Sequence, residues 1–236
     1  MFFLGSCKHQ QQKTAQEIID ESIVFYGGDR WNELHLDFQF RKHQYSLYRT
    51  KKGTVYTRTT LVEPILKDSL FSSGRFIRYQ DGAIVSLSDS LQKVYSESVN
   101  SVLYFFQIPK VLNDKAVLKS RLADQEIEGK QYHSIKISFQ KEGGGTDFED
   151  EFRYWIDTET AAIDYLAYNY LTDGGGTRFR KVNKRIEKNS MRFQDYVNYK
   201  PLDKKTPLDS LPKLFEMEQL IQLSIIENKT IRFRDQ

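Results

Sequence analysis

The segment that decides the fold is residues 148–171, which read FEDEFRYWIDTETAAIDYLAYNYL. Two runs rich in aromatic and β-branched residues, 148–156 and 162–171, flank the polar tetrapeptide Asp157-Thr158-Glu159-Thr160. Two such runs joined by a short polar turn predict a β-hairpin. The centre of the chain is therefore predicted to be antiparallel sheet.

The same strand–turn–strand pattern continues on both sides of this hairpin. Lys52-Gly53, Asp81-Gly82, Glu128-Gly129-Lys130 and Asn189 mark further turns, because these residue types tolerate the backbone angles that tight turns need. The predicted strands between them cover residues 75–80, 83–88, 118–127, 131–139, 177–186, 191–199 and 219–227. This series predicts one large antiparallel sheet, which must curl or close to protect its edges.

The strand that begins the series shows an alternating pattern. Leu34, Leu36 and Phe38 alternate with polar residues and predict a half-buried strand. The alternation changes phase before Tyr45, which predicts a β-bulge or a bend near residues 41–44.

Helices are predicted at residues 14–26, 89–107 and 211–217. The first begins with the capping box Thr14-Ala15-Gln16-Glu17, and Gly27-Gly28 supplies its C-terminal stop. No Pro/Ser-rich linker divides the chain, so residues 14–236 are predicted to form a single α+β domain.

The composition excludes several classes of protein. The 236 residues carry 35 Lys plus Arg against 32 Asp plus Glu, and this net charge of +3 is not the basic excess of a nucleic-acid-binding protein. Aromatic residues reach 14%, which gives the chain ample surface to bury and argues against disorder. A single cysteine excludes an intramolecular disulfide and a Cys-rich zinc site.

That cysteine, Cys7, ends the sequence Leu4-Gly5-Ser6-Cys7, which is similar to a bacterial lipobox. In a lipobox the cysteine is lipidated and becomes the mature N-terminus. Residues 1–13 are therefore expected to comprise a truncated lipoprotein signal peptide and a polar tether. The alternative is a frayed terminus that carries a cysteine by chance.

Several short segments of the sequence resemble a known protein family. The helix that ends in Tyr26-Gly27-Gly28-Asp29-Arg30-Trp31, and the strand–turn–strand of residues 154–166, resemble outer-membrane lipoprotein-sorting proteins. More closely, the chain is similar to an uncharacterised family of Gram-negative bacterial lipoproteins within that superfamily, through SVNSV at 98–102, EGGG at 142–145, DGGGTRFR at 173–180 and DYVNYKP at 195–201. The resemblance implies a large curled antiparallel sheet, a half-open β-barrel, with helices covering its concave face. It also implies a place in the bacterial cell envelope, facing the periplasm from the outer membrane.

Charged and polar residues on predicted apolar strand faces are the candidate ligand-binding residues. Such groups need a partner or water, because burying an unpaired polar group is costly. They are expected to line a mostly apolar concavity, the usual form of a small-molecule site. The set comprises His133, Asp150, Tyr154, Tyr168, Arg178, Arg180, Asp195 and Tyr199. The alternative is that these residues form internal ion pairs that fix the strand register.

The chain shows no motif for catalysis or for a metal. It lacks a Gly-x-Ser-x-Gly elbow and a His-x-x-x-His pair, and the glycine triplets at 143–145 and 174–176 lack the remainder of a phosphate loop. The sequence therefore predicts a lipid-anchored envelope protein that is not an enzyme. It is expected to hold a lipid-like or other apolar ligand without a cofactor, as a carrier of lipids or lipoproteins would.

Two alternatives remain open. One is a hydrolase of envelope glycans that uses a carboxylate pair such as Asp150 and Asp195. The other is an interaction module whose cavity is filled by its own side chains.

Overall fold

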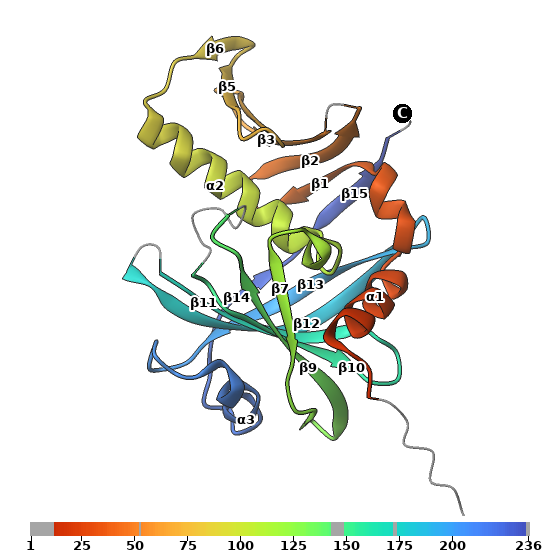
Figure 1. Ribbon diagram of the computed structural model, residues 1–236. Helices are drawn as coiled ribbons and strands as arrows, with labels where there is room; N and C mark the ends of the chain where they lie inside the picture. Colours follow the sequence, from red (N-terminus) through yellow and green to blue (C-terminus); the bar gives the residue numbers. More distant parts are fainter. Residues whose placement is uncertain (1–11, 52, 143–148, 172–173, 235–236) are drawn as a thin grey trace, which may run out of the picture.

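The strands of the protein form two antiparallel sheets (Figure 1). The computed structural model describes residues 12–51, 53–142, 149–171 and 174–234. The first sheet, sheet A, has the strand order β15-β1-β2-β3-β4-β5-β6. Its strands are β1 (His35–Phe40), β2 (His43–Thr50), β3 (Gly53–Thr60), β4 (Leu66–Phe71), β5 (Phe76–Gln80), β6 (Ala83–Val85) and β15 (Lys229–Phe233).

The second sheet, sheet B, has the order β14-β13-β12-β11-β10-β9-β7, and the short strand β8 also pairs with β9. Its strands are β7 (Val117–Arg121), β8 (Gln125–Ile127), β9 (Lys130–Phe139), β10 (Phe152–Asp157), β11 (Ile163–Tyr170), β12 (Gly176–Lys188), β13 (Met191–Lys200) and β14 (Ile221–Ile226). The C-terminal chain connects the sheets, because β14 joins sheet B and the next strand, β15, pairs with β1 of sheet A. The sheets are curled but not closed, as predicted for a half-open barrel.

Helices lie against these sheets. They are α1 (Ala15–Phe25), α2 (Asp89–Phe106) and α3 (Leu211–Glu216), with 3₁₀ turns η1 (Gly28–Glu33), η2 (Lys110–Asn113) and η4 (Leu208–Ser210). The predicted capping box of α1 is confirmed: the Thr14 side chain accepts from the Glu17 N–H, and the Glu17 carboxylate accepts from the Thr14 N–H. Figure 1 shows α2 running between the two sheets, so one helix can cover both.

Of the bulge or bend predicted near residues 41–44, the structure has a sharp reversal and no bulge. Phe40 pairs directly with His43, and the chain reverses in a two-residue turn in which Arg41 has a φ of 54°. The reversal produces the same change of phase as a bulge, and no glycine marks it. The predicted turn at Asp81-Gly82 is confirmed between β5 and β6.

Other strand boundaries differ from the predicted ones. The strand predicted at 118–127 is two strands, β7 and β8, which pair with different parts of β9. Strand β10 begins at Phe152, and residue 148 lies outside the described part of the chain. Strand β15 was not predicted, because its sequence KTIRF is short and adopts strand only by pairing with β1.

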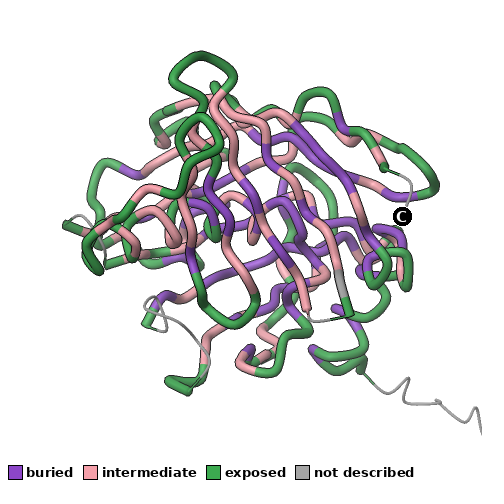
Figure 2. Tube along the Cα trace, turned by 90° about the horizontal axis from the view of Figure 1, so that it is seen from above, coloured by how far each residue is buried: buried purple, intermediate pink, exposed green. Residues whose placement is uncertain are grey.

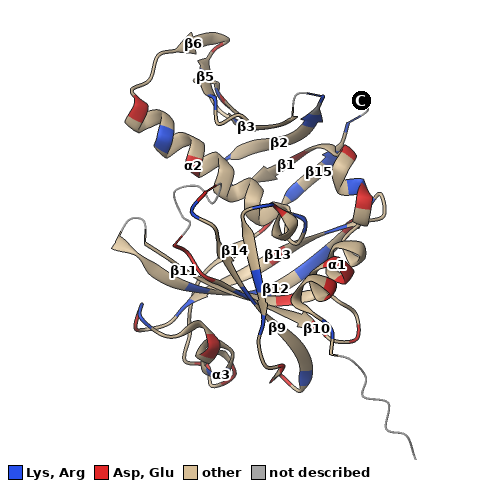
Figure 3. Ribbon diagram, viewed as in Figure 1, with Lys and Arg blue, Asp and Glu red and all other residues tan. Residues whose placement is uncertain are grey.

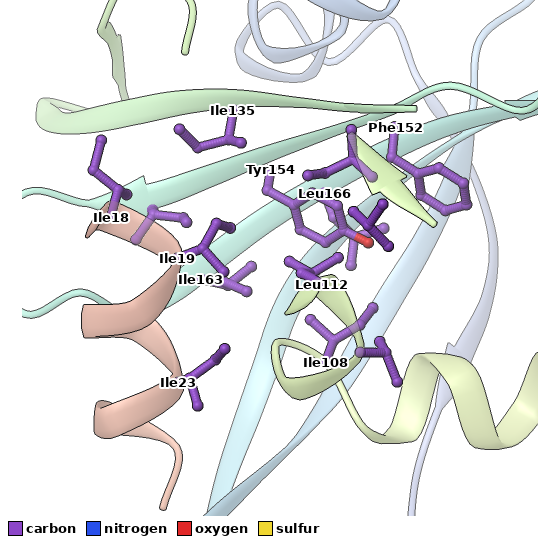
Figure 4. Packing of buried hydrophobic residues seen from close by; sticks show 14 of the residues in the cluster. Ile18, Ile19, Ile23, Ile108, Leu112, Ile135, Phe152, Tyr154, Ile163 and Leu166 are labelled. Carbon is purple, nitrogen blue, oxygen red and sulfur yellow. The ribbon is translucent and has the colours of Figure 1, made fainter. Parts of the chain in front are cut away.

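Buried side chains gather in three clusters. The first packs the isoleucines of α1 and residues of η2 against β9, β10 and β11 of sheet B (Figure 4). The second fills the space between sheet A and α2, and includes Met191 and Phe193 of β13. The third covers the other side of sheet B with η4 and α3. Figure 2 shows the buried segments running through the centres of the strands, with exposed turns at their ends.

Candidate functional site

The two faces of sheet B carry different residues because side chains alternate along each strand. Phe152, Tyr154 and Leu166 belong to the cluster beneath α1, whereas Trp155 and Phe179 belong to the cluster beneath α3. We call these the inner face and the outer face. Cross-strand pairing of Tyr154 with Leu166, and of Leu166 with Arg180, extends the inner face to β12.

A cavity of about 1040 Å³ lies over the inner face. Its walls come from α2, from strands β9 to β14 of sheet B and from β1 and β4 of sheet A. Small-molecule sites have volumes of roughly 300–1000 Å³, so the cavity is at the upper end of that range. The apolar and aromatic lining residues are Phe40, Leu70, Val102, Tyr104, Phe105, Phe106, Phe139, Phe152, Tyr168, Tyr170, Tyr196, Leu223 and Ile226.

Aromatic rings form a continuous part of this wall. Phe105 of α2 lies 5.1 Å from Tyr168 and 6.2 Å from Phe152 between ring centroids. Phe152 and Tyr168 stack at 5.2 Å with an interplanar angle of 19°. These distances are typical of favourable aromatic pairs. The wall therefore offers a packed apolar surface that joins the helix to the sheet.

The tyrosines of the wall stay neutral. Burial raises the pKa of Tyr104, and it also raises the pKa of Tyr196. Desolvation disfavours the phenolate, so both rings present uncharged hydroxyls at every physiological pH. The Tyr104 hydroxyl is itself buried and the Tyr196 hydroxyl accepts from Gln194, so neither residue adds charge to the wall.

Four of the eight sequence-predicted residues line the cavity: Asp150, Tyr168, Arg178 and Arg180. Asp150 precedes β10, Tyr168 lies on β11, and the two arginines lie two residues apart on β12, so that both point to the inner face. Arg180 donates from Nη2 to the Tyr168 hydroxyl at 2.8 Å. The fold therefore brings together residues from three separate parts of the sequence.

The other four lie elsewhere. Tyr154 is fully buried in the α1 cluster, where its ring stacks on Phe152 at 6.2 Å (Figure 4). Tyr199 is on the outer face, where its ring centroid lies 5.4 Å from that of Phe215 in α3. These two tyrosines contribute to the cores on the two sides of the sheet.

His133 and Asp195 have partners of their own away from the cavity lining. The Nδ1 atom of His133 is 3.2 Å from Asp124. Asp195 accepts at Oδ1 from the backbone N–H of Asn228 at 2.7 Å, and burial raises the pKa of its carboxyl. A register shift between Val182 and Lys184 precedes the pairing of Asp195 on β13, so strand counting could not place its side chain.

A family model matches residues 1–228 of the chain, and its description is a family of unknown function, DUF6503. The chain belongs to the DUF6503 family. A search of curated proteins finds no match.

Several solved structures are similar in fold to this DUF6503 chain. It is similar to a LolA superfamily protein from Nitrosomonas europaea, with a TM-score of 0.52, 10% identity and coverage of 95% of this chain and 96% of the other. A DUF1329 family protein from Desulfovibrio piger has a TM-score of 0.43, 8% identity and 94% coverage of each chain. A putative outer membrane lipoprotein-sorting protein domain from Vibrio parahaemolyticus has a TM-score of 0.41, 7% identity and coverage of 93% and 92%. The fold is therefore similar to that of the LolA superfamily protein, as the sequence resemblance implied.

Helices over the concave face were predicted, but sequence reasoning missed the residues of α2 that line the site. The apolar stripe of α2 includes Val99 and Leu103, which are fully buried. The consecutive aromatics Tyr104, Phe105 and Phe106 cannot all lie on one stripe of a helix, since neighbouring residues point about 100° apart. This run was the available signal that α2 has a second apolar face, and all three residues line the cavity.

The second glycine triplet shapes one edge of the cavity. Gly174 and Gly175 have φ angles of 83° and 71°, as the predicted turn requires. A Cβ atom on Gly176 would lie 2.8 Å from the Tyr170 hydroxyl and 3.1 Å from Nη1 of Arg178. The absence of a side chain at Gly176 lets Tyr170 and Arg178 approach each other. The first triplet, 143–145, and Cys7 lie outside the described residues.

In the described ranges of the chain, no group of three or more His, Cys, Asp or Glu side chains could hold a metal ion. No helix in the same ranges is both long enough and apolar enough to cross a membrane.

Proposed function

We propose that the protein binds a lipid-like ligand in the cavity between α2 and the inner face of sheet B. The observation that carries the proposal is the cavity itself, about 1040 Å³ in volume and walled by aromatic and aliphatic side chains. An acyl chain that enters it removes apolar surface from water, which stabilises the complex by roughly 25 cal/mol per Å² buried. The fold shared with a LolA superfamily protein supports this function.

The helix α2 acts as the movable wall of the site in this proposal. It connects sheet A, through Phe106 and Phe38 stacked at 3.8 Å, with sheet B, through Phe105 and Tyr168. Entry and release of a long ligand require α2 to move relative to one of the sheets. Reversible burial of this kind is what a carrier of lipids or lipoproteins needs.

The anchor and the location form a second part of the proposal. Lipidation of Cys7 would tether the domain to the envelope, with the outer membrane and a periplasm-facing domain as the expected arrangement. Each acyl CH₂ group that enters the bilayer contributes about 0.8 kcal/mol. Cys7→Ala in the full chain, expressed in a Gram-negative host, should abolish labelling by a radioactive fatty acid. Labelling or membrane attachment that persists in this variant would overturn the anchor.

Neither alternative function gains an observation in its favour. Of the carboxylate pair that a glycan hydrolase would use, Asp150 lines the cavity, whereas Asp195 is held by Asn228. The interaction module with a filled cavity does not match the open volume over the inner face.

A substitution that fills the cavity tests the binding function. Val102 lines the cavity from α2, and Val94 on the same helix is 57% exposed and is not among the lining residues. The neutral probe N-phenyl-1-naphthylamine fluoresces more strongly in apolar surroundings. We expect the wild type to bind it, Val102→Trp to weaken binding by roughly tenfold or more, and Val94→Trp to leave binding unchanged.

The thermal midpoint of each variant controls for unfolding. If the wild type fails to bind the probe, or if a folded Val102→Trp variant binds it as the wild type does, the proposal is wrong.

A further inference from the structure

Arg180 is a buried cation at the edge of the cavity. The residue is only 8% exposed, and its guanidinium carbon lies 3.9 Å from the centroid of the Phe105 ring. The rings of Tyr168 and Tyr196 lie at 5.2 Å and 5.8 Å. Arg180 is thus surrounded by aromatic carbon, where water is largely excluded.

The hydrogen bonds of Arg180 are incomplete. Nη2 donates to the Tyr168 hydroxyl, but Nε is buried without a hydrogen-bond partner in the described part of the chain. Asn198, the cross-strand partner of Arg180, also lines the cavity and has a buried Oδ1 atom without a partner. Buried polar atoms are nearly always bonded. The Nε–H of Arg180 therefore lacks an acceptor among the described residues, and the directly paired Asn198 adds a second unsatisfied polar group on the neighbouring strand.

The charge of Arg180 lacks a partner as well. No carboxylate of the described residues forms a salt bridge with it, whereas Arg153, the other buried arginine there, pairs with Asp209 at 2.6 Å and with Glu151 at 2.9 Å. A cation–π contact contributes about 0.5–2 kcal/mol. The cost of burying an ion is several kcal/mol, so the aromatic rings alone do not offset it.

The neighbouring charges favour an anion. The cationic residues that line the cavity are Arg41, Lys93, Arg178 and Arg180, against the acidic residues Glu97 and Asp150. Lys93 is 3.9 Å from Glu97, so these two balance each other. Within the described residues, Arg178 is bonded to neutral groups alone, the Thr177 carbonyl and the Tyr170 hydroxyl. Two arginines on one strand therefore provide an excess of positive charge at the β12 side of the cavity.

We infer that the ligand is an amphiphile with an anionic oxyacid headgroup, a carboxylate or a phosphate, and that Arg180 and Arg178 bind this headgroup. The apolar tail lies along the wall formed by Phe105, Phe152 and Tyr168. Guanidinium groups suit such headgroups because they donate two parallel hydrogen bonds to a pair of oxygens. This inference rests on the proposed function and specifies which lipid-like molecules the cavity takes.

Displacement of the neutral probe from the full chain tests the inference. The competitors have the same oleoyl chain and differ in headgroup: oleate, oleoyl lysophosphatidate and neutral methyl oleate. We expect at least one of the two anionic competitors to displace the probe at a concentration roughly tenfold or more below that of methyl oleate. The acid that performs better identifies the headgroup as carboxylate or phosphate.

Arg180→Met should remove this preference, which is measured for each variant as the ratio of the displacing concentrations of methyl oleate and of the better anionic competitor. Arg180→Lys keeps the charge but loses the two parallel N–H donors of the guanidinium, so it should retain part of the preference. Lys184→Met is the matched control, because Lys184 lies on the same strand, is exposed and is not a lining residue; it should behave as the wild type.

The outcomes separate this inference from the proposed function. Equal displacement by oleate, lysophosphatidate and methyl oleate, or a preference that survives in Arg180→Met, would overturn the headgroup site and leave apolar binding intact. Calorimetric binding of inorganic phosphate by the wild type but not by Arg180→Met, without any preference among the amphiphiles, would also overturn it in favour of a free-anion site. Failure of the wild type to bind the neutral probe at all contradicts the proposed function instead.

Discussion

The two faces of sheet B each bury one arginine, and the two arginines have different kinds of partner. On the outer face, Arg153 is 6% exposed and reaches the carboxylates of Asp209 and Glu151. On the inner face, Arg180 is 8% exposed and contacts aromatic rings and one tyrosine hydroxyl. On the outer face the charge of the arginine is paired, and η4 and α3 cover the strands. The inner face has an open volume and an unpaired charge, which is the expected form of a surface that is completed by a ligand.

The packing of the two faces differs in the same way. Trp155 on the outer face is fully buried beneath the third cluster, and its indole N–H donates to Gln125. Phe105, opposite the inner face, is only partly buried and lines the cavity. The outer face therefore contributes mainly to stability, and part of the inner face is free to contribute to binding.

The largest expected effect comes from the tryptophan. Trp155→Ala should lower the free energy of unfolding by about 3–5 kcal/mol, because it removes a large side chain from a closed core and leaves a void. Phe105→Ala, the matched change at the cavity wall, should cost only about 1–2 kcal/mol, since its ring already borders open space. Urea denaturation followed by circular dichroism measures both. Equal losses for the two variants would break the distinction between the faces.

The second prediction compares the two arginines directly. Arg153→Met should destabilise the protein by about 1–2 kcal/mol, because Asp209 and Glu151 lose their partner but remain accessible to water. Arg180→Met should change the stability of the ligand-free protein by less than about 0.5 kcal/mol or raise it, because an uncompensated buried charge is removed. The same denaturation experiment measures both values. A loss for Arg180→Met as large as that for Arg153→Met would show that Arg180 is a structural residue.

The smallest effect concerns Asp195, which the sequence placed beside the arginines. Burial raises the pKa of its carboxyl above the ordinary 3.8, so the folded state favours the protonated form. Its contribution to stability is then fully present below the unfolded pKa and is lost as the pH rises through the raised folded pKa. Asp195→Asn keeps an acceptor for the Asn228 N–H and removes this loss. The variant should gain stability over the wild type as the pH rises from about 4 to 7, by less than about 1 kcal/mol.

The measurement is the difference in unfolding free energy between variant and wild type at several pH values. A difference that is constant with pH, or that falls as the pH rises, would contradict the assignment of Asp195 to a buried structural position. Ligand binding by this variant should match that of the wild type, which separates Asp195 from the residues that line the cavity.

Local patterns predicted much of the fold. The hairpin around Asp157 formed because its carboxylate accepts from the N–H groups of Glu159 and Thr160, which closes the turn by interactions within the segment itself. The capping box of α1 is equally local. The turn at Arg41 was missed because no glycine marks it, and β15 was missed because it depends on a partner strand that is nearly 200 residues away in the sequence.

The candidate site was predictable only in part. The alternation along β12 correctly placed Arg178 and Arg180 on one face, and the same reasoning placed Tyr168 on a strand that faces them. It failed for Tyr199 and Asp195, because alternation along β13 groups these two residues without specifying their face. Tyr199 pairs with Phe179 of the outer face, whereas its neighbour Asn198 pairs with Arg180 of the inner face. It could not show that Phe105 of α2 lies against Arg180, since nothing in either segment specifies the other.

The sequence by itself determined most of the secondary structure and the class of fold, because hydrophobic periodicity, turn residues and helix caps act over a few residues. The tertiary structure alone decided which buried groups obtain partners. Arg153 and Arg180 each directly follow a phenylalanine in a strand, and the sequence around them does not show which one obtains a carboxylate partner. The curl of sheet B and the chain after β13 bring Asp209 to one face, and α2 brings Phe105 to the other. The partner of a charge depends on what packs across it, and that is a property of the whole fold.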